Sequence, residues 1–278
     1  MRFEPKLVRA PALPIEFEVL AGDAFIGPAI ERGVWEEHET RLFRAHAEAG
    51  SRVLDLGANV GWFSVQAILC GCDVVAFEPV PEIAAICQRN IERAMKVGRG
   101  RGQLLPFAAG AVAGSATIAL SPKNFGDNRV LDEGAARPKD MERGEELAIR
   151  LERVDDHVTG PVRVIKIDTQ GSEWLALQGA RRLLDASPRV AMLLEFWPYA
   201  LRGAQPEELL AFLCAERFEI GKATAAPYPM SPERILRQAR ARDPVKGGLD
   251  LYATRGVPFH VGGFERRVRS IYRRLREP

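Results

Sequence analysis

From residue 51 onward, short apolar runs alternate with stretches of helical periodicity, and this alternation constrains the fold more than any other feature of the sequence. The run RVLDLG is followed by the helical pattern FSVQAILC, and DVVAFEP is followed by EIAAICQRNIERAMKV. Alternation of this kind is typical of a mostly parallel sheet whose helices cover both of its faces. The sequence therefore predicts a doubly wound α/β fold with a mostly parallel, seven-stranded sheet.

The same pattern places the expected strands and helices along the chain. Strands are expected at 52–57, 73–79, 103–112 with 115–120, 162–168, 189–196, 218–225 and 249–255. Helices are expected at 36–49, 63–70, 82–97, 173–186 and 206–216. An arginine-rich segment joins the last two strands, which are expected to form an antiparallel pair at one edge of the sheet.

The chain divides into a lead-in, a main domain and a tail. Residues 1–50 are expected to form a small N-terminal lead-in, in which residues 15–31 make two short strands around AGD. Residues 51–256 form the main domain, and its segment 121–150 lacks periodicity, which is typical of a functional loop. Residues 257–278 are expected to form a basic amphipathic helix. Its apolar positions share one helical stripe: Phe264, Val268, Ile271, Tyr272 and Leu275.

The composition is that of an ordinary globular protein and argues against several classes. Charged residues make up 27% and the formal net charge is only +2, so no nucleic acid partner is expected. The N-terminus lacks the apolar core of a signal peptide, and no apolar run reaches the ~20 residues that span a bilayer. The four cysteines show neither the density of a disulfide scaffold nor paired CxxC motifs. We therefore expect a cytoplasmic protein.

The turn in VLDLGANVG is the expected ligand site, because ligands bind at the carboxyl ends of parallel strands. The turn lacks both GxGxxG and a Gly-Lys-Ser or Gly-Lys-Thr sequence, which disfavours dinucleotides and triphosphates. Gly57, Asn59 and Gly61 lead into a helix start whose backbone N–H groups suit a carboxylate, and Asp55 suits a cation. The methionine half of S-adenosylmethionine carries both of these groups.

A second element of the expected cofactor site is AFEPVPE, at the end of the second strand of the main domain. Its Glu78 lies about twenty residues beyond Gly57, where a carboxylate accepts hydrogen bonds from both hydroxyls of a ribose. Pro79 is expected to pack on the adenine face, and Ala109, at the end of the third strand, to leave space beside the ring. The alternative is that the turn is a plain glycine turn and that Glu78 caps the next helix.

Four segments, taken in order and spacing, resemble the FkbM-type family of S-adenosylmethionine-dependent class I methyltransferases: VLDLGANVGWFS, AFEPVPE, VIKIDTQGSEWLALQGA and LLEFWP. The resemblance covers about residues 30–220 and includes GVWEEH in the lead-in. It implies a Rossmann-like fold and methyl transfer to hydroxyl groups, often on sugars or secondary metabolites. It also implies that Glu36 lies near the amino acid end of the cofactor. The chain departs from the family motif KIDVEGxE, because it reads KIDTQGSE with Gln170 in place of the first glutamate.

Two acids at neighbouring strand ends are the expected centre of the chemistry. Asp168, which ends the fourth strand, is the expected general base or orienting group for the acceptor hydroxyl, and Glu195 ends the fifth. The alternatives are that Asp168 orients the turn TQGSE and that Glu195 caps a helix or pairs with an arginine. Lys166, inside a strand, is expected to have a neutralising partner or to lie at an exposed edge of the sheet, and His38 is an alternative base.

The same two acids also permit a metal-assisted mechanism. Asp168 and Glu195 would then bind Mg²⁺, which lowers the pKa of a coordinated hydroxyl, although Gln170 leaves no evident third ligand.

The acceptor is expected to be a small molecule with a hydroxyl group, such as a sugar or its carrier-linked form. Asn124, Asn128 and Arg129, in SPKNFGDNR, offer groups suited to sugar hydroxyls or a phosphate, although a solvated turn explains them as well. The alternatives are an RNA or protein methyltransferase and a non-catalytic module that binds S-adenosylmethionine. The basic tail is expected to dock on the protein itself or on the partner in a homodimer, with peripheral contact to an anionic membrane as the alternative.

Overall fold

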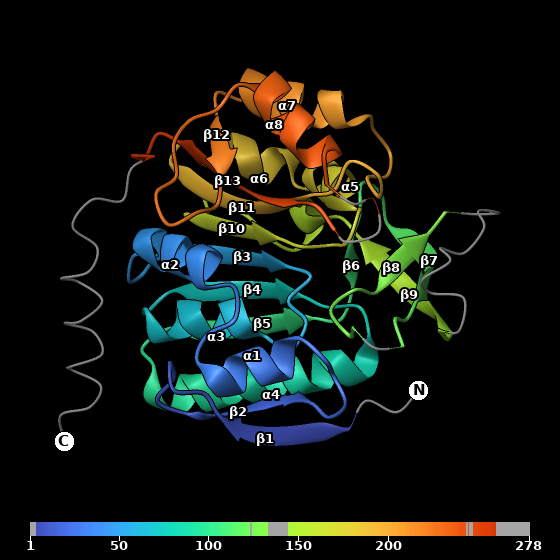
Figure 1. The fold of residues 1–278 in the computed structure, drawn as a ribbon. Coiled ribbons are helices and arrows are strands. Elements are labelled where there is room, and N and C mark those ends of the chain that lie inside the picture. The colour runs from blue at the N-terminus through green and yellow to red at the C-terminus, as the bar shows by residue number, and fades with distance from the viewer. Residues whose placement is uncertain (1–3, 123, 133–143, 243, 245–246, 260–278) are drawn as a thin grey trace.

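The computed structural model describes residues 4–122, 124–132, 144–242, 244 and 247–259, and its centre is a seven-stranded sheet (Figure 1). Its strands are β3 (Arg52–Leu56), β4 (Asp73–Phe77), β5 (Arg101–Leu105), β10 (Val164–Ile167), β11 (Val190–Phe196), β12 (Glu219–Lys222) and β13 (Leu249–Arg255). They lie in the order β12-β13-β11-β10-β3-β4-β5. All neighbours from β11 to β5 are parallel, whereas β13 is antiparallel to both β11 and β12. The predicted doubly wound sheet with an antiparallel C-terminal edge is confirmed.

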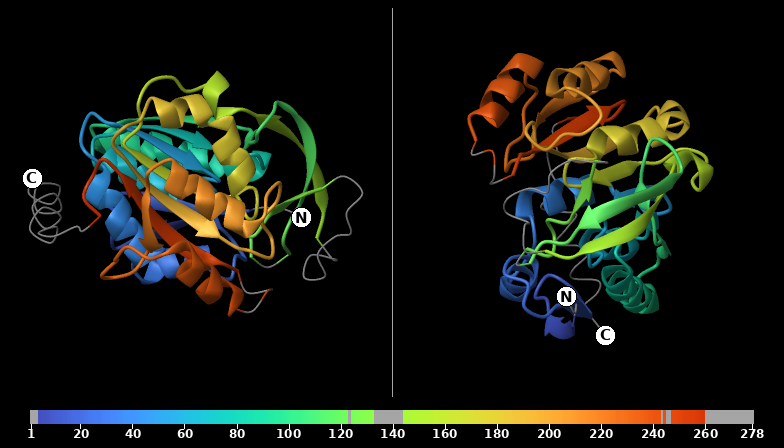
Figure 2. Two further views of the ribbon diagram at one scale, coloured as in Figure 1. Left: turned by 90° about the horizontal axis from the view of Figure 1, so that it is seen from above. Right: turned by 90° about the vertical axis from the view of Figure 1, so that its right-hand side faces the viewer.

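The central sheet is covered by helices on both faces, as the views in Figure 2 show. Successive residues of one strand enter different layers of the core, because side chains alternate across a strand. Val53 packs in the layer under α2 (Glu37–His46), α3 (Trp62–Leu69) and α4 (Pro81–Val97), whereas Leu54 packs in the opposite layer. That second layer contains α5 (Glu173–Gly179), α6 (Arg181–Asp185) and α7 (Pro206–Ala215). Burial on both faces explains why these strands read as continuous apolar runs.

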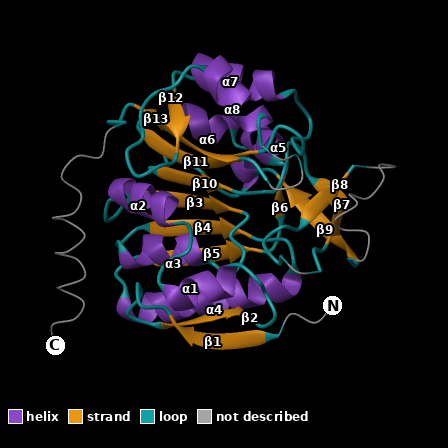
Figure 3. Cartoon of the chain, viewed as in Figure 1, coloured by secondary structure: helices purple, strands orange, loops and turns teal. Residues whose placement is uncertain are grey.

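A second sheet, of four strands, stands beyond the carboxyl ends of the parallel strands (Figures 1 and 3). It consists of β6 (Ala108–Ala109), β7 (Gly114–Ala119), β8 (Arg129–Leu131) and β9 (Glu146–Glu152), in the order β6-β9-β7-β8. The expectation of a single unpatterned loop over 121–150 is wrong, because that segment contributes β8 and most of β9. In β9, Leu147, Ile149 and Leu151 alternate with other residues in the two-residue period of a strand. Residues 133–143 lie outside the described residues.

The third predicted strand, 103–112, is also divided between the two sheets. β5 ends at Leu105, one residue before Pro106, and the chain then leaves the central sheet. Proline lacks an N–H group and does not continue a sheet ladder. Ala109 therefore lies in β6, where it pairs with Glu152 of β9, and not at the end of a central strand.

The lead-in differs from its expected form in one element. β1 (Pro5–Arg9) pairs with β2 (Glu16–Leu20), but the second expected strand of 15–31 is the helix α1 (Ile26–Arg32). Asp23 explains the helix start, because its Oδ2 accepts hydrogen bonds from the backbone N–H groups of Phe25 and Gly27. The hairpin lies beside α4 (Figure 1), and α2 forms where a helix was expected.

The arginine-rich segment between β12 and β13 contains the helix α8 (Pro232–Arg240), which Ser231 caps by accepting a hydrogen bond from the N–H of Arg234. The predicted tail helix lies outside the described residues from position 260 onward. No helix within the described ranges is long and apolar enough to cross a membrane.

Candidate active site

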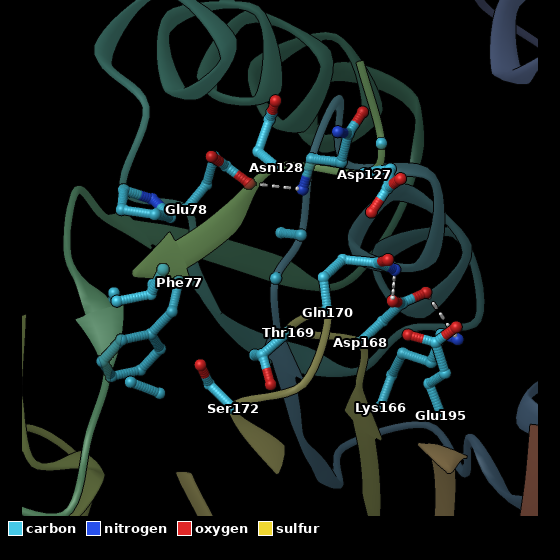
Figure 4. Close-up of a pocket in the computed structure, with 18 of the residues that line it drawn as sticks. Phe77, Glu78, Asp127, Asn128, Lys166, Asp168, Thr169, Gln170, Ser172 and Glu195 are labelled. Atoms are coloured by element: carbon cyan, nitrogen blue, oxygen red, sulfur yellow. Dashed lines mark hydrogen bonds and ion pairs between the residues drawn. The ribbon is translucent and has the colours of Figure 1, made fainter. Parts of the chain in front are cut away.

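A cavity of about 730 Å³ opens at the carboxyl ends of the parallel strands, where the central sheet meets the four-stranded sheet. Glu78 lies at one end of it, after β4, and Glu195 of β11 lies at the other (Figure 4). Gly57 after β3 and Asp168 after β10 lie between them. The topology explains the cavity, because parallel strands end at one edge and their turns converge there.

The turn after β3 packs directly against the end of β10. Gly57 has a φ of +81°, and a Cβ placed on it would lie 1.9 Å from the carbonyl oxygen of Asp168, so only glycine fits. Asn59 also has a positive φ, 50°, and donates from Nδ2 to the carbonyl of Phe125, 3.1 Å away. The turn is therefore joined both to the end of β10 and to the 121–128 loop.

Glu78 is buried and holds the same turn. Its Oε2 accepts a hydrogen bond from the N–H of Asn59 at 2.9 Å, and its Oε1 accepts one from the N–H of Val80 at 3.0 Å. Burial raises the pKa of this carboxyl to about 7. Pro79 and Ala109 line the cavity on the same side. The predicted adenosyl residues Glu78, Pro79 and Ala109 thus line one cavity, and the alternative that Glu78 caps the next helix is wrong, because α4 has no side-chain cap.

Two of the predicted cofactor residues do not line the cavity. Asp55 is 1% exposed, and its Oδ2 accepts a hydrogen bond from Ser64 Oγ of α3 at 2.6 Å. Gly61 faces α4, since a Cβ placed on it would lie 2.9 Å from Cys87 Sγ. Both residues fix the turn to the body of the protein, and Asp55 does not lie where it could meet a ligand cation.

A buried lysine organises the other end of the cavity. Lys166 Nζ lies 3.1 Å from Glu36 Oε2, 3.3 Å from Asp168 Oδ2 and 5.0 Å from the centre of the Phe63 ring. The expected neutralising partner of Lys166 is confirmed, and there are two. Glu36 begins α2 in a left-handed conformation, with a φ of 45°, and burial raises its pKa to about 8. The neighbouring carboxylates hold the pKa of Lys166 well above its usual range against the opposing effect of burial.

Both carboxylate oxygens of Asp168 have hydrogen-bond donors. Lys166 Nζ donates to Oδ2 at 3.3 Å, and Gln170 Nε2 donates to Oδ1 at 2.7 Å (Figure 4). Gln170 has a positive φ of 51°, and in this conformation its side chain contacts Asp168. Glu173 fixes the turn by accepting hydrogen bonds from the N–H groups of Thr169 and Gly171, each at 3.0 Å. An ionised glutamate at position 170 would have no N–H group to donate to Asp168, whereas the amide of Gln170 has one. The replacement of glutamate by Gln170 therefore adds a hydrogen bond that the sequence did not reveal.

Glu195 lies opposite Asp250 across the antiparallel pair β11 and β13. Its Oε2 is buried and has no hydrogen-bond partner among the described residues. Burial, together with the charges of Asp168, Glu173 and Asp250, raises the pKa of Glu195 well above its usual range. Burial also raises the pKa of Asp250. Sequence reasoning missed Asp250, because the register of β13 against β11 cannot be read from either strand alone.

The predicted acceptor residues have different environments. Asn124 and Asn128 line the cavity, but Asn128 is engaged within its own loop, accepting from the N–H of Ser121 and donating to the carbonyl of Phe125. Arg129 does not line the cavity. It donates from Nε and Nη2 to the two carboxylate oxygens of Asp127, at 2.7 and 2.8 Å, and its guanidinium lies 4.3 Å from the centre of the Trp197 ring. His38 does not line the cavity either.

The alternative with Mg²⁺ gains no support from the donor set. The ammonium group of Lys166 already lies 3.3 Å from Oδ2 of Asp168, one of the two proposed metal ligands. Over the described ranges, no group of three or more His, Cys, Asp or Glu side chains is arranged to hold a metal ion.

Comparison with known proteins gives one family match. A sequence model described as "Methyltransferase FkbM domain" matches residues 55–220, which is more than half of the chain. No curated protein matches the sequence.

Among solved structures, a methyltransferase FkbM from Methylobacillus flagellatus aligns with a TM-score of 0.45 and 18% identity, over 73% of this chain and 43% of its own. This chain therefore spans less than half of the length of that protein. The magnesium protoporphyrin IX methyltransferase from Synechocystis, solved with bound S-adenosylmethionine, aligns with a TM-score of 0.45 and 14% identity, over 84% of this chain and 85% of its own. An rRNA methylase from Streptococcus thermophilus aligns with a TM-score of 0.43 and 11% identity, over 81% of this chain and 98% of its own.

Proposed function

The chain belongs to the FkbM methyltransferase family, and from this premise we propose that it transfers a methyl group from S-adenosylmethionine to a hydroxyl group of a small molecule. The observation that supports the proposal best is the cavity itself. It runs from one buried carboxyl group, Glu78, past a glycine turn to a second group of carboxyls around Lys166. Its volume lies within the range of small-molecule sites.

The residues of the Glu78 end fit the adenosyl part of the cofactor. A carboxylate offers about four acceptor positions, so Glu78 keeps two for ribose hydroxyls after its bonds to Asn59 and Val80. Pro79, Ala109 and Leu151 supply apolar surface for an adenine ring. Gly57 allows close approach of the methionine part, and Glu36 and the end of β10 lie beyond it.

The chemistry requires mainly position and a proton acceptor. The bound cofactor supplies a methyl group that is already activated as an electrophile, so alignment of the acceptor oxygen accounts for most of the catalysis. Asp168 lies midway along the cavity with 23% of its side chain exposed, and Lys166 and Gln170 fix its orientation. We assign to Asp168 the acceptance of the hydroxyl proton or the orientation of that hydroxyl. Glu195, the other predicted catalytic acid, lies one strand further along.

We also propose a cytoplasmic location. All four cysteines are free thiols, which is typical of proteins in a reducing compartment.

Calorimetric titration with S-adenosylhomocysteine and with NAD tests the cofactor assignment. We expect binding of the first and none of the second, and binding of NAD alone would contradict the proposal. Methyl-labelled S-adenosylmethionine is then incubated with the protein and separate small-molecule, RNA and protein fractions. We expect label in the small-molecule fraction, whereas label confined to RNA or protein would contradict the acceptor class.

The Asp168→Asn variant tests the catalytic assignment. We expect turnover to fall about 10²-fold, the usual contribution of a positioned proton acceptor, and affinity for S-adenosylhomocysteine to stay within about twofold. Full activity in this variant would show that Asp168 has neither role.

A further inference from the structure

We propose that Glu195 and Asp250 bind an ammonium group carried by the methyl acceptor, so that the acceptor is an alcohol that also bears an amine, such as an amino sugar or an aminocyclitol. The proposal rests on the proposed function, because it takes this end of the cavity to be the acceptor end.

The first argument is the register of the two strands. Glu195 of β11 and Asp250 of β13 are direct partners in the antiparallel ladder, so their side chains leave the same face of the sheet as neighbours. Both residues line the cavity. Like charges directly opposite each other in a sheet destabilise it, and here the surroundings are buried as well. Protonation relieves this cost, as the raised pKa values of both carboxyls reflect, and a cation that binds between the two carboxyls would relieve it as well.

The second argument is that no cation among the described residues forms an ion pair with Glu195 or Asp250. The charged groups around the pair in the described part of the chain are Glu36 and Glu39 at the start of α2, Lys166 of β10 and Asp168 after it, Glu173 from α5, and Arg242 after α8. Lys166 forms its ion pairs with Glu36 and Asp168, and neither pair includes Glu195 or Asp250. Arg242 is exposed. Glu195 Oε2 is buried without a hydrogen-bond partner in the described part of the chain.

The third argument is the position of the pair along the cavity. Neighbouring strands lie about 4.8 Å apart, so β11 and β13 lie roughly 10 and 14 Å from β3, on the side away from Glu78. The cofactor's own ammonium group belongs with its methionine part at the β3 turn, where Glu36 and the end of β10 are nearer. The group that reaches Glu195 and Asp250 therefore comes from the acceptor.

The backbone beside the pair leaves room for such a group. Gly247 and Gly248 line the cavity immediately before β13, and a Cβ placed on Gly247 would lie only 3.7 Å from Glu195 Oε1. With glycine at position 247, that residue has no side chain to cover the carboxyl oxygen. A compact ammonium group is then able to approach both carboxyls.

Matched pairs of probes test the charge requirement. The protein, saturated with S-adenosylhomocysteine, is titrated at about pH 7 with D-glucosamine against D-glucose and with 2-deoxystreptamine against myo-inositol. The dissociation constants are read from the NMR signals of the tryptophan indole N–H groups. We expect the amine of each pair to bind at least about tenfold more tightly, which corresponds to roughly 1.4 kcal/mol.

Two variants and one control locate the effect. Glu195→Gln and Asp250→Asn should each reduce the preference for the amine to within about twofold while leaving affinity for S-adenosylhomocysteine unchanged. Glu219→Gln, which removes an exposed carboxyl from β12, should keep the full preference. If the amine and the neutral probe of both pairs bind with equal affinity, the proposal is overturned. Two carboxyls that merely share a proton would give this result. A preference that survives in both variants overturns the proposal as well.

The same titrations are repeated without S-adenosylhomocysteine. If the protein does not bind that ligand, the proposed function fails, and the preference for the amine is still measured separately.

Discussion

At one end of the cavity, the single carboxyl group of Glu78 is matched by two backbone N–H groups, whereas at the other end five carboxyl groups lie around one buried lysine. At the first end, backbone N–H groups of adjoining turns give each oxygen of Glu78 one hydrogen bond. The second end depends on Lys166 and leaves Glu195 Oε2 without a hydrogen bond in the described structure. The comparison indicates that the proposed adenosyl end is preorganised by the backbone, and that the proposed acceptor end gathers carboxyl groups whose negative charges are mutually unfavourable.

The largest effect that distinguishes the two ends is expected from Lys166→Met. Loss of the buried ammonium leaves Asp168 without its neighbouring cation, and breaking a buried ion pair in this way costs about 3–5 kcal/mol. We expect the free energy of unfolding, measured by urea denaturation at about pH 7, to fall by that amount.

Lys96→Met, at an exposed position near the end of α4, is the control and should stay within about 0.5 kcal/mol of the parent protein. If both variants were equally stable, Lys166 would not organise the acceptor end.

The second prediction concerns the adenosyl end. Glu78→Ala removes the proposed ribose acceptor and should weaken binding of S-adenosylhomocysteine about 10- to 100-fold in calorimetric titration, since hydrogen bonds to a charged group contribute about 1.5–3 kcal/mol. The matched change Glu82→Ala removes an exposed acid in the first turn of α4 and should leave the affinity unchanged. Equal affinities in the two variants would refute the assignment of Glu78 to the ribose.

The third prediction is a dependence of stability on pH that has a different range at each end. Burial raises the pKa of Glu78 to about 7 and that of Glu36 to about 8, so in the folded state both groups keep a proton that the unfolded chain has lost. Stability is then fully present below about pH 4.5 and is lost as the pH rises through these values. We expect the free energy of unfolding to fall between about pH 5 and 8, by roughly 1.4 kcal/mol per pH unit for each such carboxyl.

Single variants separate the two ranges. Glu78→Gln should reduce the slope by the share of one carboxyl only below about pH 7, and Glu36→Gln should reduce it by the same share up to about pH 8. Urea denaturation followed by tryptophan fluorescence across this range is the measurement, with Glu219→Gln as the control. A slope that neither variant changes would mean that other groups cause it.

The central sheet could be predicted from the sequence because each of its strands carries its own signal. Strands such as β3 and β11 are continuous apolar runs next to helices with clear periodicity, and burial on both faces follows from that pattern alone. The four-stranded sheet could not be predicted in the same way. Its strands β6 and β8 have two and three residues, and the pairing of β6 with β9 depends on contacts between residues far apart in the chain.

The candidate site was predictable where the residues of a sequence motif also make the contacts that form the site. Gly57, Asn59 and Glu78 are examples, because the turn and the acid that holds it are marked by local motifs. Asp55 carried the same local signal, yet its side chain points to Ser64 and not to the cavity. A motif does not state which side of a turn faces the ligand.

The proposed acceptor end was harder to predict from the sequence, because its residues come from elements far apart in the chain and meet through strand register. Asp250 meets Glu195 through the alignment of β13 with β11, and Glu36 reaches Lys166 from the lead-in. Gln170 was visible only as a departure from a motif, and its hydrogen bond to Asp168 gives that departure a physical meaning.

The contact between Gly57 and the carbonyl oxygen of Asp168 has a consequence for protein engineering. The two residues are more than a hundred positions apart, yet the space between them admits no additional atom. In a chimaera assembled from two relatives, VLDLGANVG and VIKIDTQG should therefore be taken from the same parent. Glu195 and Asp250 lie outside this contact, so they are the positions at which to begin a redesign of acceptor choice.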